Sequence, residues 1–138
     1  FKIKRLYMNI LVVDDNKPVQ EKLAALITSQ GHTVDLAING LDALGKAQQG
    51  DYQLYVIDHL MPLMNGVQLT KNLKTEHLSP LVPVIFMTTQ GTQTLKSLAE
   101  FNLFDKVIDK PINEKHFLTI LSELVNVNFE NDPLQVKA

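Results

Sequence analysis

The chain has 138 residues, a size that fits one domain built on one hydrophobic core. Hydrophobic residues make up 45% and charged residues 20% of it, an ordinary globular composition that excludes a disordered protein. The net charge of −2 provides no basic field for nucleic acid, and the absence of cysteine excludes disulfides, thiolate catalysis and cysteine-based zinc sites.

The ends of the chain carry weaker signals than its middle. We expect residues 1–8 to form an N-terminal extension or linker, residues 9–126 to form the single domain, and residues 127–138 to form a C-terminal tail. No apolar run approaches the roughly 18–20 residues that a membrane span needs. No signal peptide is visible, so we expect a cytoplasmic protein without membrane contact.

The first part of the chain alternates between strand and helix signals. Residues 10–13 are continuously apolar, which is typical of a strand buried on both faces of a parallel sheet. Asn16 and Pro18 favour the start of a helix that Gly31 ends. Residues 33–38 alternate between apolar and polar, which suits a strand at the sheet edge. A short helix then follows the Asn39-Gly40 turn.

The alternation continues to the last helix. Residues 54–57 form a third strand, residues 67–73 a third helix and residues 84–87 a fourth, strongly buried strand. Leu95, Leu98 and Ala99 have the spacing of a fourth, less hydrophobic helix, and a short strand lies at 106–108. The clearest amphipathic helix covers 117–125, after which we expect a frayed tail.

This order of elements predicts the fold class. Five strands alternate with five helices and no hairpin signal is present. The pattern indicates an α/β protein with a doubly wound, five-stranded parallel sheet covered on both faces.

Polar side chains follow four of these strands at their carboxyl ends. They are Asp14 with Asp15, then Asp58, Thr88 and Lys110. In open parallel sheets, ligands bind at this edge. Taken alone, Asp58 is as easily explained as a cap of the turn that follows it. The polar residues at the other strand ends favour a functional role for Asp58 over turn capping.

The combination of these residues indicates phosphoryl transfer. Two carboxylates about 4 Å apart repel by roughly 4 kcal/mol at an effective dielectric constant of 20, so clustered acids favour a divalent cation such as Mg²⁺. Lys110 brings a positive charge to an anion, and Thr88 brings a hydroxyl that can bond a phosphoryl oxygen. Because the chain has no cysteine and no serine at a strand end, we expect a carboxylate nucleophile, and Asp58 stands alone on its strand.

These motifs resemble the receiver domain of two-component response regulators, of the chemotaxis-regulator type. The matching features span roughly residues 9–125: Asp14-Asp15, Asp58 followed by Met61-Pro62 and Gly66, Thr88, and Lys110-Pro111. The resemblance implies a flavodoxin-like sheet with strand order 2-1-3-4-5. It also implies a cis peptide bond between Lys110 and Pro111.

The resemblance further implies a role for each site residue. Asp58 would accept a phosphoryl group from a phosphohistidine on a histidine kinase or phosphotransfer protein. Asp15, Asp58 and the backbone carbonyl of Leu60 would bind Mg²⁺, with Asp14 assisting. Lys110 would contact the phosphoryl group, and Thr88 would swing toward it.

The implied output is a switch in protein contacts. It would act on a downstream protein through the face formed by the fourth helix, fifth strand and fifth helix, and it would allow a phosphorylation-dependent homodimer. The chain would then be a signalling domain that phosphorylates and dephosphorylates itself, not a turnover enzyme.

Several positions depart from the family pattern or leave alternatives open. Val107 stands where the family usually has Tyr or Phe, and Thr89 stands where a small residue is usual. These departures keep open a degenerate receiver that acts as a phosphate-independent interaction module. Leu60 and Gln90 occupy positions that tune phosphate lifetime in the family. Leu60 also takes the place of the second acid that a phosphatase with an aspartate nucleophile would need.

Other motifs have plainer explanations. Residues 40–47 nearly match a phosphate-binding loop, but Ala47 replaces the required hydroxyl and a helix is favoured. The histidines share no metal-ligand spacing and are expected on the surface or in loops, with a reservation for His59 beside Asp58; they are His32, His59, His77 and His116. Phe101 and Phe104 are expected to pack in the core or at its edge, with a partner-binding role as the lesser alternative.

Overall fold

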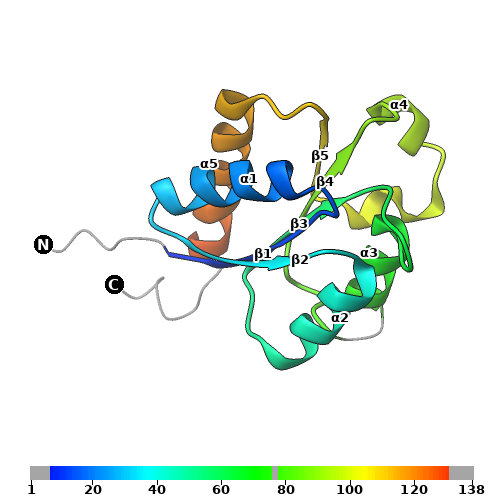
Figure 1. Ribbon diagram of the computed structural model, residues 1–138, viewed down its shortest axis with the longest axis horizontal. Helices are drawn as coiled ribbons and strands as arrows, with labels where there is room; N and C mark the ends of the chain where they lie inside the picture. Colours follow the sequence, from blue (N-terminus) through cyan, green and yellow to red (C-terminus); the bar gives the residue numbers. More distant parts are fainter. Residues whose placement is uncertain (1–6, 76–77, 131–138) are drawn as a thin grey trace, which may run out of the picture.

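A computed structural model describes residues 7–75 and 78–130 of the chain. Its centre is a five-stranded parallel sheet in the order β2-β1-β3-β4-β5 (Figure 1). The strands are β1 (Asn9–Val13), β2 (Thr33–Ala37), β3 (Leu54–Asp58), β4 (Val84–Thr88) and β5 (Lys106–Asp109). This topology confirms the predicted doubly wound α/β fold of flavodoxin type.

Helices cover both faces of the sheet (Figure 1). The helical segments are α1 (Lys17–Ser29), α2 (Gly40–Gln49), α3 (Gly66–Thr75), α4 (Thr92–Leu95), the 3-10 helix η1 (Ala99–Leu103) and α5 (Glu114–Glu130). One apolar cluster joins α1 and α5 to the sheet face that carries Ile10 and Val12. A second joins α2 and α3 to the opposite face, which carries Leu11 and Val13. Successive strand residues point to opposite faces, so each central strand is buried on both.

Local signals set several element boundaries as predicted. Asn16 caps α1, because its side chain accepts a hydrogen bond from the Val19 N–H at 3.0 Å. Gly31 follows the helix with φ of 92°, a conformation that a glycine adopts without strain. The edge strand β2 alternates between exposed and half-buried residues before the buried Ala37.

The predicted fourth helix is shorter than its apolar spacing suggested. The helix α4 ends at Leu95, and Leu98 has an extended backbone with ψ of 141° before η1 begins. Hydroxyl groups compete for the backbone carbonyls of this segment: Thr94 Oγ1 donates to Gln90 O at 2.9 Å, and Ser97 Oγ donates to Thr94 O at 3.1 Å. Such bonds weaken a helix only slightly, because Thr70 makes the same bond to Gly66 O inside the continuous helix α3.

Both ends of the domain differ slightly from expectation. Met8, assigned to the predicted extension, is buried with 2% exposure and packs in the cluster under α1 and α5. The helix α5 continues to Glu130, beyond its predicted end near Val125, because no Gly or Pro interrupts the sequence there. None of the helices in the described ranges is long and apolar enough to cross a membrane.

Candidate functional site

Three carboxylates meet at the carboxyl edge of the sheet. Asp14 and Asp15 follow β1, and Asp58 ends the neighbouring strand β3, whose Ile57 pairs with Val13. One oxygen from each carboxylate lies within 4.8 Å of the other two. Asp14 and Asp58 are 0% and 6% exposed, whereas Asp15 is exposed. The structure therefore brings together the acids that the sequence placed at this edge.

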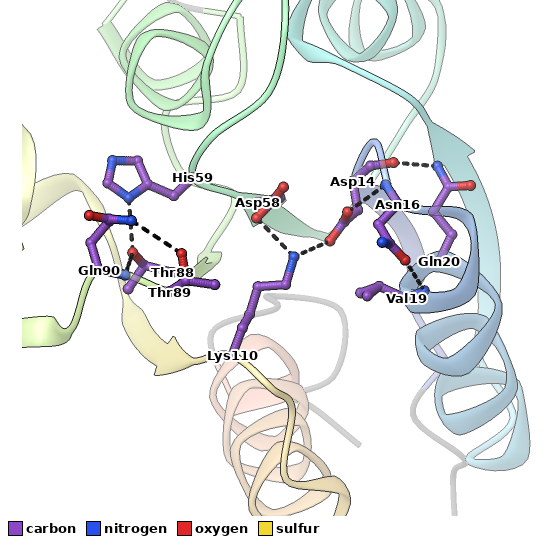
Figure 2. A network of polar contacts seen from close by, with 10 residues as sticks. All are labelled: Asp14, Asn16, Val19, Gln20, Asp58, His59, Thr88, Thr89, Gln90 and Lys110. Carbon is purple, nitrogen blue, oxygen red and sulfur yellow. Dashed lines mark hydrogen bonds and ion pairs between the residues drawn. The ribbon is translucent and has the colours of Figure 1, made fainter.

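Lys110 reaches this acidic cluster from the end of β5. Its Nζ lies 3.0 Å from Asp14 Oδ2 and 3.1 Å from Asp58 Oδ1 (Figure 2). The peptide bond between Lys110 and Pro111 is cis, as the family resemblance implied. The side chain thus spans the distance from β5 to the ends of β1 and β3. With three carboxylates against one ammonium, negative charge remains in excess.

The electrostatics of the cluster follow from burial. Burial raises the pKa of Asp58 to about 6; Asp14 and Asp15 also raise it, and the hydrogen bond and charge of Lys110 offset them in part. Burial lowers the pKa of the Lys110 ammonium, but its contacts with Asp14 and Asp58 outweigh burial and leave that pKa raised. The pKa of Asp58 therefore lies close to neutral pH, and additional positive charge near the carboxylate would keep it ionised.

The donor set fits a small divalent cation. Carboxylate oxygens are the hard ligands that Mg²⁺ takes in proteins, usually one or two together with waters and phosphate oxygens. Both oxygens of Asp14 already have protein partners: Oδ1 accepts from the Asn16 N–H at 2.8 Å, and Oδ2 pairs with Lys110. Asp15 and Asp58 are consequently the acids best able to offer direct ligands. Gln20 holds the backbone of Asp14 in place, because its Nε2 donates to the backbone oxygen of Asp14 at 2.7 Å.

The loop after β3 requires Gly66. A Cβ at this position would lie 2.2 Å from the backbone oxygen of Asp58, so only glycine lets α3 start against the end of β3. The Gly66 N–H also donates to His59 O at 2.8 Å. Leu60 lies in this loop with an exposed side chain. That its backbone carbonyl binds the cation stays a prediction.

Thr88 and His59 form a second polar contact beside the acids (Figure 2). Thr88 is fully buried, and its Oγ1 lies 2.9 Å from His59 Nδ1 and accepts from the Gln90 N–H at 2.9 Å. The His59 ring packs on Phe86 with centroids 5.3 Å apart, and burial lowers the pKa of His59. The contact was not predicted; its one sequence signal was the position of His59 beside Asp58.

The remaining sequence predictions have mixed outcomes. His116 is exposed, and His32 lies in the loop before β2, as expected, although it is buried there and its Nδ1 accepts from the Met8 N–H at 3.0 Å. His77 lies outside the described residues. Phe104 stacks on Phe86 with centroids 3.9 Å apart, and Phe101 contacts it edge-on, which confirms packing roles. Residues 40–47 lie in α2, as expected for a helix.

A cavity lies at the output face that the resemblance implied. Its volume is about 330 Å³, and it is lined by Val107, Ile108, Asp109, Pro111, Asn113 and His116. Val107 is half-buried, and Thr89 is exposed at the end of β4. The side chain of Val107 packs against the apolar cluster of α2 and α3.

A protein-family model matches most of the chain. The model of the response regulator receiver domain matches residues 10–122. The protein PilH of Pseudomonas aeruginosa is 31% identical over 116 residues, which are 84% of this chain and 96% of PilH. Response regulator RR06 of Streptococcus pneumoniae is 32% identical over 83% of this chain, but this chain spans only 49% of RR06.

Solved structures show the same fold. A CheY-like receiver domain protein from Methanospirillum hungatei superposes with a TM-score of 0.82 at 22% identity, covering 90% of this chain and 98% of that one. The response regulator TrrA of Thermotoga maritima, solved with Mg²⁺ and BeF, has a TM-score of 0.76 at 26% identity over 84% of this chain and 97% of its own.

Proposed function

The chain belongs to the response regulator receiver family, and from this we propose that it accepts a phosphoryl group on Asp58 from a phosphohistidine of a histidine kinase or phosphotransfer protein. The observation that carries the proposal is the setting of Asp58. Asp58 is 6% exposed, and its carboxylate contacts Lys110 at 3.1 Å and lies beside two other acids at the ligand-binding edge of the sheet.

The transfer requires a carboxylate nucleophile and a stabilised phosphoryl group. An Asp58 oxygen attacks phosphorus, a new O–P bond forms, and the P–N bond to the donor imidazole breaks with its electron pair returning to nitrogen. Lys110 already holds its ammonium 3.1 Å from Asp58 Oδ1, so it can move its contact from the carboxylate to the incoming phosphoryl oxygens.

Mg²⁺ fits the same cluster through Asp15, Asp58 and the Leu60 carbonyl, with Asp14 assisting indirectly. When bound, it would neutralise charge on the phosphoryl oxygens and keep Asp58 ionised. Both Asp14 oxygens have other partners, which supports its indirect role. The Mg²⁺-bound TrrA structure supports the expectation by analogy.

The phosphoryl group would add about −1.5 to −2 charges to the site. Thr88, fully buried at the end of β4, would turn its hydroxyl toward that charge. The response would reach a downstream protein through α4, β5 and α5, where the cavity beside Val107 leaves room for rearrangement. A homodimer formed on phosphorylation would depend on the same rearrangement of α4, β5 and α5.

One observation favours a second candidate function. Val107 provides no aromatic ring to change rotamer, so the chain would serve as an interaction module that does not depend on phosphate. The retained acids and Lys110 argue against that alternative, because a module of this kind would need none of them.

Phosphorylation with a small donor tests the proposal. The chain is incubated with acetyl phosphate, with and without Mg²⁺, and its intact mass is measured. We expect one added phosphoryl group that requires Mg²⁺ and is lost in Asp58→Asn. Asp51→Asn, the same substitution at an exposed residue before β3, is the matched control and should be labelled normally. Unchanged labelling of Asp58→Asn would contradict the proposal.

A further inference from the structure

We propose that His59 is a positioning residue that holds Thr88 away from the phosphorylation site and thereby sets how readily the domain switches. The inference rests on the proposed function, because it concerns the equilibrium that a phosphoryl group would shift. It starts from the 2.9 Å contact between His59 Nδ1 and Thr88 Oγ1.

The two polar contacts of the site point in different directions. Figure 2 shows the Asp58 carboxylate turned toward Lys110 and the adjacent His59 ring turned toward Thr88. Asp58 and His59 are consecutive, so the end of one strand directs one side chain to the acids and the next to the end of β4. The backbone reinforces this arrangement, because the His59 N–H donates to Met87 O at 2.9 Å.

The Thr88 hydroxyl has two hydrogen-bond partners in this arrangement. It has one proton and two lone pairs. One lone pair accepts from the Gln90 N–H at 2.9 Å, and His59 Nδ1 takes the second partner position at 2.9 Å. Within the described residues these are its two hydrogen-bond partners. In the His59 tautomer whose Nδ1 accepts, the single hydroxyl proton is given to His59, so Thr88 must give up that contact to donate to a phosphoryl oxygen.

The His59 ring is itself held in place. It packs on Phe86 with centroids 5.3 Å apart, and Phe86 in turn stacks on Phe104 at 3.9 Å. Phe86 is fully buried, so the surface on which the imidazole lies is rigid. A fixed ring loses less conformational freedom when it forms a hydrogen bond, which makes the bond to Thr88 a stable competitor of the phosphoryl group.

Thermodynamics then gives the direction of the effect. If the contact exists only in the resting state, removing it raises the population of the state that binds the phosphoryl group. The net contribution of an ordinary hydrogen bond between neutral groups corresponds to roughly a 2- to 10-fold change in that equilibrium. His59 would act through Thr88 and would not touch the reacting atoms.

Two substitutions separate the hydrogen bond from the packing. His59→Phe keeps an aromatic ring against Phe86 but removes the bond to Thr88. His59→Asn loses the ring but keeps a polar group near the place of Nδ1, and its amide can donate or accept. Beryllofluoride serves as the phosphoryl mimic, and its affinity is measured by calorimetry with saturating Mg²⁺ on the whole chain.

We expect His59→Phe to bind beryllofluoride roughly 2- to 10-fold more tightly than wild type. His59→Asn should remain within about two-fold of wild type, a rescue that a purely structural role of the ring would not produce. On a Thr88→Ala background, His59→Phe should have no effect, because the bond it removes is already absent.

The outcomes distinguish this inference from the proposed function. If wild type does not bind beryllofluoride with Mg²⁺, the proposed function fails. If wild type binds, but His59→Phe binds no more tightly, or its gain persists without the Thr88 hydroxyl, the role of His59 is contradicted. Circular dichroism and unfolding midpoints establish that each variant is folded, and a His59→Phe chain that does not fold is replaced by His59→Leu in the same comparison.

Discussion

Replacing Asp58 by Asn should stabilise the fold at neutral pH, although it removes one partner of a buried ion pair. Burial, with the charges of Asp14 and Asp15, raises the pKa of Asp58 from its ordinary value of 3.8 to about 6 against the opposing effect of Lys110. A pKa unit corresponds to about 1.36 kcal/mol, so the ionised carboxylate costs the folded state about 3 kcal/mol. This is an upper value for the gain from neutralising it.

The loss of the ion pair reduces that gain. Breaking a buried pair by removing one charge commonly costs about 3–5 kcal/mol, because the other charge is left without a partner. Here Lys110 keeps its 3.0 Å contact with Asp14, and the amide introduced by Asp58→Asn would still offer an oxygen as an acceptor. We therefore expect a net stabilisation below that upper value, on the order of 1–2 kcal/mol, for Asp58→Asn in the absence of Mg²⁺.

The pH dependence has a definite sign. Below pH 3.8, Asp58 is protonated in both the folded and unfolded states and costs nothing. Between pH 3.8 and about 6 the unfolded state loses its proton first, so wild type loses stability as the pH rises; above about 6 the cost is complete. The difference between Asp58→Asn and wild type should therefore open across this window.

Urea unfolding provides the measurement. Because the chain has no tryptophan, unfolding is followed by circular dichroism, for both proteins with a chelator at several pH values. Adding Mg²⁺ at 100 times its dissociation constant should stabilise wild type by about 2.7 kcal/mol and the variant by less. An Asp58→Asn chain less stable than wild type at pH 8, or a stability difference between the two that does not depend on pH, would contradict this prediction.

The remaining predictions concern three other positions. Lys110→Met leaves the acids without their cation, and we expect urea unfolding without Mg²⁺ to show a loss of about 1–3 kcal/mol that shrinks when Mg²⁺ is saturating; an equal loss with and without Mg²⁺ would contradict the electrostatic explanation. Gly66→Ala places a methyl group against the Asp58 backbone oxygen and should cost about 1–3 kcal/mol in urea unfolding, together with weaker Mg²⁺ binding by calorimetry; unchanged values would show that the loop can move aside. Val107→Tyr should be accepted by the adjacent cavity with a change in unfolding free energy of less than about 1 kcal/mol, and a larger loss would mean that the cavity cannot admit the ring.

Much of the fold follows from local patterns in the sequence. The continuous apolar runs of β1, β3 and β4 predict strands buried on both faces, and the alternation of β2 predicts an edge strand; both features are present. The helix α4 was less predictable. Its apolar spacing extends through Leu98, but the helix ends at Leu95 and the backbone of Leu98 is extended, which the spacing of apolar residues does not indicate.

The site likewise has features that the sequence predicted and features that it did not. The acids and Lys110 were identifiable because strand ends in a parallel sheet share one edge, so position in the chain translates directly into position in space. The support of Asp14 by Gln20 could not be predicted, because Gln20 is one polar residue among several on α1 and only the packing turns it inward. The contact between His59 and Thr88 likewise depends on a rotamer fixed by Phe86, which belongs to another strand.

Chemical trapping identifies the residue that carries the phosphoryl group. The chain is treated with acetyl phosphate and Mg²⁺, the acyl phosphate is reduced with borohydride, and the modified residue is located by peptide mass spectrometry. An aspartyl phosphate is converted to homoserine, so we expect homoserine at position 58. Homoserine at any other position, or a phosphoryl group that resists borohydride, would contradict it.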